Sequence, residues 1–496
     1  MAASTYPNSI MLVNGLSIPR TDKTLERYYT LRRVVRAISI LLILVLATSL
    51  PLAQAQTTIS EQSQFQCPLT VFGEYEAQQV HLQSTGDPTT MNVIWSSVTA
   101  TGGGAYVQWF DSDGSIIGED EAREYCYLGH NMVFYMATMS DLIPGQEVTY
   151  KIPSSEQFLE FSFTPIDSNA QHFEWISIAD HGDSAEGEAV SDAIIADTSA
   201  QLVTISGDIS YADGDQSVWD DWFNYQQESM VKIPWITCVG NHENEPGFEF
   251  TPYEHRFDSD GEEGSETFWY SRNYPGVHMV FMSTEHDYDV GSPQYTWLEQ
   301  DLSSVDRSVT PFVIVYGHSP MYSSNSYHGS EVELRDAVEN LYVEKGVDFV
   351  IAGHDHFYER TWPVNSETVV DTGTDGLFVR GQAPIHLVIG MAGRAAYEDL
   401  DEPQPEWSAY RENNSYGWTK WNYDGELREI SFTFYRIDGT IGDQFTLLES
   451  LPVVEESDDE PASVPGFSSL ITILAIFGAS LQSVIKNRDS IECEST

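Results

Sequence analysis

Basic residues are scarce in this chain of 496 residues, which has 23 Lys and Arg against 76 Asp and Glu and a formal net charge of −53. Only six of the basic residues are lysines, and no basic cluster follows the first forty residues. This balance argues against nucleic acid as a partner, because phosphate backbones are bound by clustered Lys and Arg. A site for an anionic substrate would have to supply its own positive charge, which bound metal ions can do.

Cysteine is also scarce, with four residues and no CxxC motif. These features exclude a disulfide scaffold and a zinc site built from cysteines. Cys67 and Cys126 lie in one predicted domain and could form a disulfide in an oxidising compartment. Cys238 lies in an apolar run and is expected to be a buried thiol, and Cys493 lies in the tail.

Long apolar runs outside the folded part occur near the two ends of the chain. Residues 37–50 follow three arginines and precede Ala53-Gln54-Ala55, a pattern that predicts a leader and signal peptide over residues 1–55. An uncleaved signal-anchor is the alternative. Either interpretation predicts that the rest of the chain is exported.

The C-terminal end of the sequence predicts that the protein is tethered to a membrane or cell surface. Residues 449–466 are acidic and contain proline, as in a solvated stalk. Residues 467–485 are mostly apolar and are followed by Lys486 and Arg488 in the tail 486–496, which favours a transmembrane or sorting segment. A buried or interfacial helix is the alternative. We therefore expect a protein that is secreted or held at the extracellular surface.

The first folded part, residues 56–166, alternates apolar and polar residues with turn signals between the runs, which predicts an all-β sandwich. Trp95 is a candidate core residue. No chemistry is visible in this part, so its expected role is support. The predicted strands are residues 79–82, 91–95, 106–109, 148–152 and 158–163.

From residue 167 to 448 the pattern changes to nearly continuous apolar runs separated by segments with helical spacing, such as residues 331–345. Continuous runs are typical of strands buried on both faces, so this part is predicted to be an α/β domain. The runs are residues 173–178, 202–205, 233–239, 311–316 and 347–351.

Side chains able to bind metal ions follow each of these five runs, and glycine precedes four of the ligand groups, where it allows a sharp backbone turn. The carboxyl ends of strands in an α/β sheet gather side chains into one site. Each residue alone fits a turn or a core position, but their recurrence at five strand ends outweighs that interpretation. The donors are Asp180, Asp208, Tyr211, Asn241, His318, His354 and His356.

Asp208 and Tyr211 predict the kind of site. One carboxylate can bridge two cations with its two oxygens, and seven oxygen and nitrogen donors suit two first-row ions with positions left for water. A phenol with an ordinary pKa of about 10 loses its proton only to an acidic cation, which favours Fe(III) over Zn, Mg or Mn. His354 and His356 are one residue apart and could serve the two ions separately.

These motifs resemble those of the purple acid phosphatases, a family within the calcineurin-like metallophosphoesterases, and in particular the large plant-type members. The resemblance covers about residues 70–447 and implies a four-layer α/β/β/α sandwich preceded by a fibronectin type III-like domain. It is carried by residues 180–182, 207–211, 240–243, 315–318 and 353–356.

The resemblance also implies residue roles. Asp180, Tyr211 and His356 would bind Fe(III), Asn241, His318 and His354 a divalent ion (Zn, Mn or Fe(II)), and Asp208 would bridge the two ions. His242 would bind the substrate phosphate beside Asn241 and protonate the leaving group, with His328 assisting.

Two positions depart from the family pattern. Tyr327 stands where larger members often keep a further histidine, and residues 391–394 (Met-Ala-Gly-Arg) replace an acidic, glycine-rich stretch. The remaining histidines His81, His130, His278 and His386 are expected to be structural, and His181 could at most orient a ligand. The substrate pocket is therefore expected to differ from that of the plant enzymes.

The function implied is hydrolysis of small phosphate monoesters by a metal-bound hydroxide, with no nucleic-acid partner. A phosphodiesterase, nucleotide pyrophosphatase or phytase on the same metal site is the alternative, because the metal ligands do not fix the leaving group. A surface adhesion protein with a vestigial site is a more remote one. A homodimer and glycosylation at Asn413 stay open.

Overall fold

The computed structural model describes residues 74–451 except 156, 258–266 and 382, together with two short strands near the N-terminus. The chain divides into two units, Met1–Phe65 and Gln66–Thr496. In the first unit, β1 (Ile10–Val13) pairs antiparallel with β2 (Leu16–Pro19), a hairpin that the prediction of a leader did not include.

Several sequence predictions fall outside the described residues: the apolar segments 37–50 and 467–485, nearly all of the acidic stalk, the tail, and Cys67. Cys126 is disulfide-bonded, and its pairing with Cys67 stays a prediction. Cys238 is a buried free thiol, as expected. In the described parts of the chain, no helix is both long and apolar enough to cross a membrane.

Two four-stranded antiparallel sheets form the first part of the second unit, in the orders β3-β4-β8-β7 and β10-β9-β5-β6. They enclose a core in which Trp95, Tyr135 and Tyr150 are fully buried. The strands are β3 (Gln78–Ser84), β4 (Met91–Ser97), β5 (Tyr106–Phe110), β6 (Ile116–Glu121), β7 (Arg123–Tyr125), β8 (Val133–Met139), β9 (Val148–Ser154) and β10 (Gln157–Phe163).

Two seven-stranded sheets follow. The first has the order β13-β12-β11-β24-β25-β26-β21, and its strands are β11 (His172–Ile178), β12 (Leu202–Ser206), β13 (Trp235–Cys238), β21 (Leu377–Val379), β24 (Gly417–Asp424), β25 (Glu429–Arg436) and β26 (Ile441–Leu448). β11, β12 and β13 are parallel to one another, and β24 joins β11 antiparallel. Three of the five apolar runs predicted from the sequence are therefore neighbouring parallel strands of a mixed sheet.

The second sheet has the order β14-β15-β16-β17-β22-β18-β23, in which β15, β16, β17 and β22 are parallel. Its strands are β14 (Tyr270–Tyr274), β15 (Val277–Phe281), β16 (Phe312–Tyr316), β17 (Phe349–Ala352), β18 (Tyr358–Thr361), β22 (Ile385–Ile389) and β23 (Ser408–Glu412). A small hairpin, β19 (Val364–Asn365) and β20 (Thr368–Val369), lies between β18 and β21 in the sequence.

Helices cover the outer faces of both sheets. They are α2 (Ala185–Ala196), α3 (Gln216–Met230), α4 (Thr251–Glu254), α5 (Pro293–Ser304) and α6 (Val332–Lys345), with a 3-10 turn η1 at Asn241–Glu243. Ser184, Asp215 and Ser292 cap the starts of α2, α3 and α5 with their side chains, and α6 ends at Gly346, whose φ is 67°. The helix predicted over residues 331–345 is thus present as α6.

Successive side chains of the central strands are buried in two different cores, which explains the layers. Trp175 of β11 and Tyr316 of β16 point into the core between the two sheets, where Trp175 stacks on Trp421 of β24. Ile176 of β11 faces α2 and α3 instead, and Val315 of β16 faces α5 and α6. Strands that bury both faces need continuous apolar sequence, which is the pattern the sequence has.

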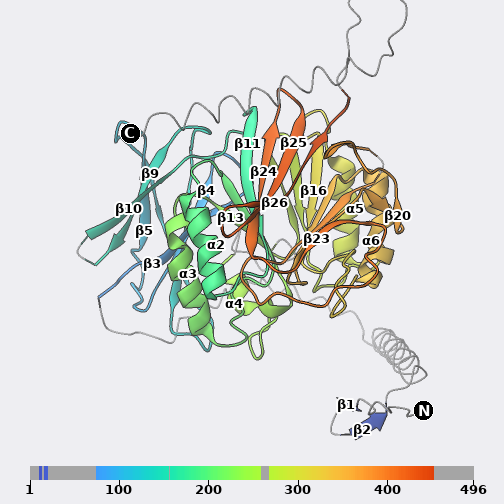
Figure 1. Cartoon of the computed structure of the whole chain (residues 1–496). Helices are drawn as coiled ribbons and strands as arrows, with labels where there is room; N and C mark the ends of the chain where they lie inside the picture. The colour runs from blue at the N-terminus through green and yellow to red at the C-terminus, as the bar shows by residue number, and fades with distance from the viewer. Residues whose placement is uncertain are drawn as a thin grey trace, which may run out of the picture. The chain divides into compact units, whose positions relative to one another are not determined.

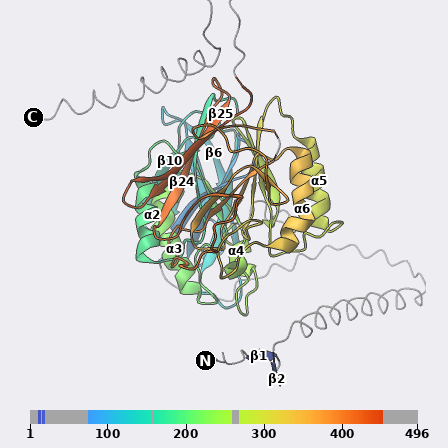
Figure 2. The ribbon, with the colours of Figure 1, turned by 45° about the vertical axis from the view of Figure 1, so that its right-hand side comes forward.

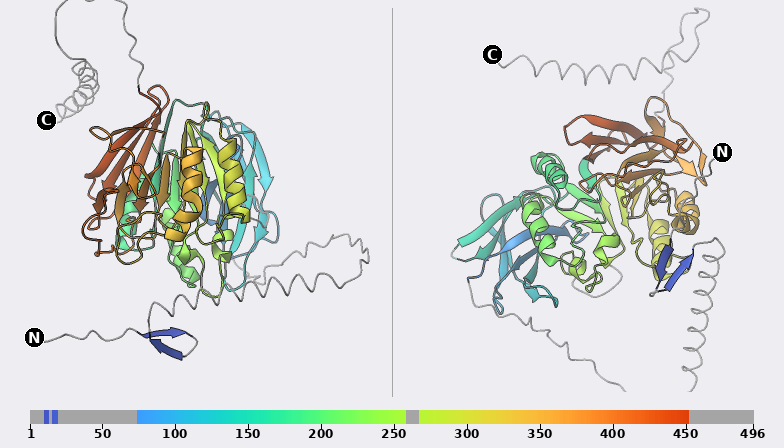
Figure 3. Two further views of the ribbon diagram at one scale, coloured as in Figure 1. Left: turned by 90° about the vertical axis from the view of Figure 1, so that its right-hand side faces the viewer. Right: turned by 60° about the horizontal axis from the view of Figure 1, so that its bottom comes forward.

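The resulting order is helix, sheet, sheet, helix. Figure 1 shows α2 and α3 in green on one side of the strands and α5 and α6 in gold on the other, and Figure 2 shows the same separation after rotation. The β-sandwich, in blue and cyan, lies beside the green helices in the right view of Figure 3, and α3 contacts β3. This arrangement leaves the carboxyl ends of the parallel strands free to carry a site.

Candidate metal centre

The seven predicted donors lie at the carboxyl ends of strands from both sheets. Asp180 follows β11, Asp208 and Tyr211 follow β12, and Asn241 opens the 3-10 turn after β13. The other three come from the second sheet, where His318 follows β16 and the pair His354 and His356 follows β17. The two sheets therefore contribute the two sides of one site.

The backbone at these positions is unusual. Asp180, Asp208, Tyr211 and His354 have φ values of 56°, 51°, 58° and 68°, in the left-handed region that non-glycine residues rarely adopt. Such conformations persist only where surrounding structure enforces them, and they cluster at functional sites. Here the left-handed turn follows directly on a strand and directs the side chain to the centre.

Glycines allow the close approach of these segments. A Cβ atom on Gly240 would lie 2.2 Å from Asp208 Oδ1, and one on Gly353 would lie 2.3 Å from Asp180 Oδ2. A Cβ on Gly390, after β22, would lie 2.3 Å from the Asp355 carbonyl oxygen and 2.8 Å from Asp180 Oδ2. Any side chain at these positions would displace a carboxylate.

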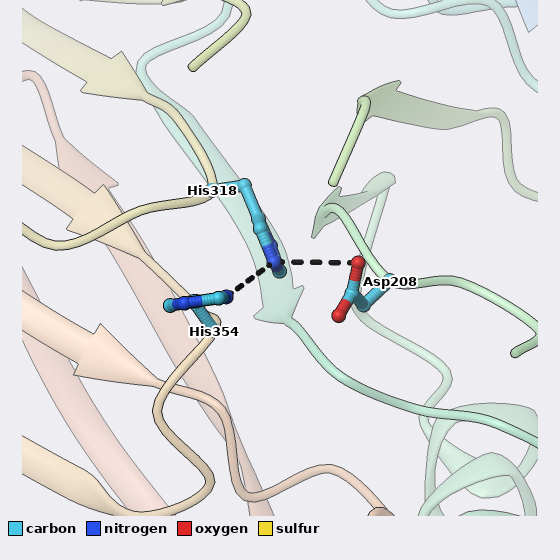
Figure 4. Close-up of side chains that lie close together, drawn as sticks. All are labelled: Asp208, His318 and His354. Atoms are coloured by element: carbon cyan, nitrogen blue, oxygen red, sulfur yellow. Dashed lines mark hydrogen bonds and ion pairs between the residues drawn. The ribbon is translucent and has the colours of Figure 1, made fainter. Parts of the chain in front are cut away.

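One group of donors gathers around His318. Its Nε2 lies 3.1 Å from Asn241 Oδ1, 3.3 Å from Asp208 Oδ1 and 3.2 Å from His354 Nδ1. His354 Nδ1 is also 2.8 Å from Asn241 Oδ1. Figure 4 shows Asp208 and His354 on either side of His318, and the ligand atoms of these three residues all lie within 4.8 Å of one another.

A second group gathers around Tyr211. Its hydroxyl donates to Asp180 Oδ1 at 3.0 Å and lies 3.0 Å from His356 Nε2, and His356 Nε2 lies 3.4 Å from Asp180 Oδ1. His354 links the two groups, because its backbone N–H donates to Asp180 Oδ2 at 2.8 Å. The structure thus brings all seven predicted donors together, and Asp208, which the resemblance places between the two ions, contacts the group around His318.

The donor set fits a pair of cations. His318 Nδ1 donates to the Ser206 carbonyl at 2.9 Å, and His356 Nδ1 donates to the Ala395 carbonyl at 2.9 Å, which leaves both Nε2 atoms directed at the centre. Lone pairs of ring nitrogens and carboxylate oxygens at such short separations repel one another unless a proton or a cation lies between them, so the centre can accept positive charge. Oxygen and imidazole ligands suit first-row ions such as iron, zinc and manganese.

Burial is the largest single influence on the pKa of each of these donors, although neighbouring charges can together outweigh it. It lowers the pKa of His354 to about 3, with the neighbouring His318 adding to the effect. Burial would also lower the pKa of His318, but Asp208 outweighs it and raises that pKa well above the ordinary value. Burial together with Asp180 and Asp208 raises the pKa of Tyr211 far above that of a free phenol. A phenolate here needs a strongly acidic cation beside it.

Glu243 holds two of the ligand loops together, a role that sequence reasoning missed although the residue closes the Gly240–Glu243 motif. Its buried carboxylate accepts from the backbone N–H groups of Asp208 and Ile209, both at 2.8 Å, and of Gly240 at 2.7 Å. Burial and the nearby Asp208 raise the pKa of Glu243 to about 8. Glu243 therefore fixes the loops after β12 and β13 relative to each other.

His242 lies at the edge of the site, with a side chain 30% exposed. Its Nδ1 is 2.5 Å from Asp213 Oδ1 and its Nε2 is 3.8 Å from Asp208 Oδ2, so the ring is held with Nε2 toward the donors. Its ring also lies 4.3 Å from the Tyr211 ring, centre to centre. The contact of Asp213 with His242 could not be read from the sequence.

His328 also lies at the site, since its ring centre is 4.3 Å from that of His354. Tyr397, which sequence reasoning missed, stacks on His356 at 4.2 Å, and its hydroxyl lies 3.4 Å from His328 Nε2. Tyr327 is 72% exposed and its ring contacts both His328 and Tyr397. Aromatic and histidine rings therefore form the wall of the site on this side.

The other histidines have structural surroundings. His181 is buried between α2 and α3, where it contacts Ser191 and accepts from Trp222 Nε1. It does not contact a donor through its ring in the described part of the chain. The four histidines expected to be structural are all buried: His81, His130, His278 and His386.

Comparisons with known proteins agree with this geometry. The family described as "Calcineurin-like phosphoesterase" matches residues 170–358, and "Iron/zinc purple acid phosphatase-like protein C" matches residues 383–444. The chain is 32% identical over 358 residues to a purple acid phosphatase of Glycine max, covering 68% of this chain and 77% of the relative. It is 34% identical over 252 residues to a phosphoenolpyruvate phosphatase of Allium cepa, covering 48% and 51%.

A solved structure has the same fold. The purple acid phosphatase isolated from yellow lupin (Lupinus luteus) seeds superposes with a TM-score of 0.69 at 22% sequence identity, covering 77% of this chain and 78% of the lupin chain.

Proposed function

The chain belongs to the purple acid phosphatases, which are metal-dependent phosphatases, and from this premise we propose that its seven strand-end donors hold an iron and a divalent ion for the cleavage of phosphate monoesters. Asp180, Tyr211 and His356 bind Fe(III), and Asn241, His318 and His354 bind Zn, Mn or Fe(II), with Asp208 between them. The observation that carries this assignment is the convergence of the seven side chains into two contacting sets.

The two ions, when bound, neutralise phosphoryl oxygens and lower the pKa of water. The protein contributes position and charge. It is strongly acidic overall, so a phosphate group is attracted only where this local positive charge outweighs the carboxylates. The rigid loops around Glu243 keep the donors in place as substrate enters and product leaves.

His242 supplies the proton for the leaving group. Asp213 accepts a hydrogen bond from its Nδ1–H, and in the doubly protonated ring the second, transferable proton lies on Nε2, on the side that faces Asp208. The ring is partly exposed and stays accessible to the outer part of a substrate. His328 lies on the opposite wall beside His354 and contacts the substrate there, and Asn241 contacts the phosphate beside His242.

We also propose that the N-terminal β-sandwich is a fibronectin type III-like support for the catalytic part. Three of its contacts reach α3 and the loop that follows it: Gln79 Nε2 donates to Asp220, the Val80 N–H donates to Gln227, and the Tyr150 hydroxyl donates to the Val231 carbonyl. Because α3 follows directly on the loop with Tyr211 and Asp213, these contacts brace that loop. Export of the chain is consistent with the disulfide of Cys126.

The experiment compares three substrates on the metal-loaded protein: an aryl monoester, its bis-ester and a nucleoside triphosphate. We expect the largest kcat/KM for the monoester, and loss of activity in Asp208→Asn, which removes one charge from the carboxylate between the two sets. A larger kcat/KM for the bis-ester or the nucleotide would refute the monoesterase assignment.

A further inference from the structure

Arg394 lies at the position where the sequence departs from the plant-type pattern, in the loop after β22. Its backbone is held firmly: its N–H donates to the Asp180 carbonyl at 3.0 Å, and Ser184 Oγ donates to the neighbouring Gly393 carbonyl at 2.7 Å. A Cβ on Gly393 would lie 2.3 Å from the His181 carbonyl oxygen. The base of the Arg394 side chain is therefore fixed relative to the donors.

The guanidinium of Arg394 lies over the ring of Tyr211, with its central carbon 4.2 Å from the ring centre. Gly182 leaves room for this contact, because a Cβ there would lie 3.3 Å from the Tyr211 ring and 3.9 Å from Arg394 Cδ. The His242 ring also lies 4.3 Å from the Tyr211 ring. The ring of Tyr211 thus contacts both His242, the proposed acid, and Arg394, the one arginine or lysine that lies over this ring among the described residues.

Arg394 has no protein partner for its charge within the described ranges, where its side chain forms neither a hydrogen bond nor an ion pair. Other arginines of this acidic chain are paired: Arg411 lies 2.9 Å from Glu402, and Arg436 lies 2.6 Å from Glu412. Arg394 is only half-buried, so its donors can reach a ligand. A guanidinium offers a planar fork that matches a carboxylate or a phosphate group.

The guanidinium of Arg394 lies away from the place where the donors would hold the reacting phosphoryl group. The hydroxyl of Tyr211, and not the centre of its ring, reaches Asp180 and His356. The guanidinium therefore lies over the ring of Tyr211, away from the hydroxyl that reaches the donors, where it borders the site without contacting Asp180 or His356. A second anionic group on the leaving group would meet Arg394 there.

We infer that Arg394 forms an anion subsite that selects phosphate monoesters whose leaving group carries a further carboxylate or phosphate. This selectivity rests on the proposed function, because it concerns substrates of the same metal centre. It also explains how a chain with so few basic residues can accept a substrate that is more negatively charged than a simple monoester.

The test uses two matched pairs of compounds with the metal-loaded full chain. Glycerol 3-phosphate and 3-phosphoglycerate differ in a hydroxymethyl group against a carboxylate, and kcat/KM is measured for both. Ethylphosphonate and phosphonoacetate differ in a methyl group against a carboxylate and cannot be hydrolysed, and their dissociation constants are measured by calorimetry. The variants are Arg394→Gln, Arg394→Lys and, as a control with the same loss of charge, Arg428→Gln in the exposed turn between β24 and β25.

We expect the wild type to prefer the carboxylate member of each pair and Arg394→Gln to lower that preference about tenfold, which corresponds to about 1.4 kcal/mol. Arg394→Lys should retain part of the preference, because a lysine keeps the charge and loses the fork. Arg428→Gln should leave it unchanged.

The inference would be overturned if Arg394→Gln kept the wild-type preference for the carboxylate member of each pair. It would also be overturned if Arg394→Gln weakened kcat/KM or binding equally for both members, because Arg394 would then contact the transferred phosphoryl group. A wild type that hydrolyses neither ester would instead contradict the proposed function, and the subsite with it.

Discussion

His242→Ala tests the chemistry assigned to the edge of the metal site. His242 contacts Asp213 and the ring of Tyr211, but it belongs to neither set of donors. Its removal should therefore leave the metal content and visible colour unchanged while it removes the proton for the leaving group. A positioned general acid contributes about 10²–10⁴-fold, which is ~3–5 kcal/mol of the activation free energy.

Asp213→Asn is a matched variant whose expected loss of activity lies between those of the wild type and His242→Ala. The Asp213 and His242 side chains are 48% and 30% exposed, and pairs that are this exposed contribute about 0.2–1 kcal/mol. The variant should therefore lower kcat by at most about fivefold, through poorer orientation of the ring. It should keep the weak dependence of kcat on leaving-group pKa expected of the wild type, which His242→Ala should make steep.

The assay measures kcat for alkyl and aryl monoesters whose leaving alcohols differ in pKa. A basic alkoxide needs a proton more than a nitrophenolate does, so His242→Ala should lose far more activity on alkyl esters. Equal losses across the series would refute the role of His242 as the acid. So would an alkyl esterase activity within tenfold of the wild type.

Two further predictions concern the packing of the site and the stability of the fold. Gly353→Ala should release bound metal, because its Cβ would lie 2.3 Å from Asp180 Oδ2. Gly317 also precedes a histidine donor, but a Cβ there meets only side-chain atoms at 3.3 Å and beyond, so Gly317→Ala should retain metal. Equal metal content in both variants would contradict this account. His386→Phe should flatten the acid side of the stability profile. Burial lowers the pKa of His386 to about 3, so the unfolded chain binds a proton from about pH 6.5 downward that the folded chain does not, and stability is lost as pH falls. Denaturant unfolding at several pH values should show a slope smaller by about 1.4 kcal/mol per pH unit between pH 6.5 and 4 in the variant, and parallel slopes would argue against the buried neutral ring.

The sequence was sufficient to predict that these seven side chains gather at one site, because each follows a continuous apolar run and glycines mark the sharp turns. His318 and His354 needed no knowledge of the tertiary structure, since both strands end in the same local pattern. The grouping of the donors into two sets followed from the family resemblance. Their contact distances, and the left-handed backbone at Asp180 and Asp208, required coordinates.

Other features depend on contacts between distant segments. Nothing in the sequence pattern indicated that β24 pairs antiparallel with β11, or that β25 and β26 extend the first sheet beyond β24. In the sandwich, β6, β7 and β8 were missed; β6 and β7 are edge strands rich in charged residues, and β8 has too continuous an apolar face to show alternation. Tyr397 and Arg394 act through a loop whose position is set by tertiary packing.

The most direct test of the metal centre is metal analysis of the purified chain together with its visible spectrum, for the wild type and Tyr211→Phe. We expect two metal ions per chain, one of them iron, and a visible band that Tyr211→Phe removes, because only a phenolate bound to Fe(III) produces it in this donor set. A wild type without iron, or a band that survives in Tyr211→Phe, would contradict the assignment of the seven strand-end donors.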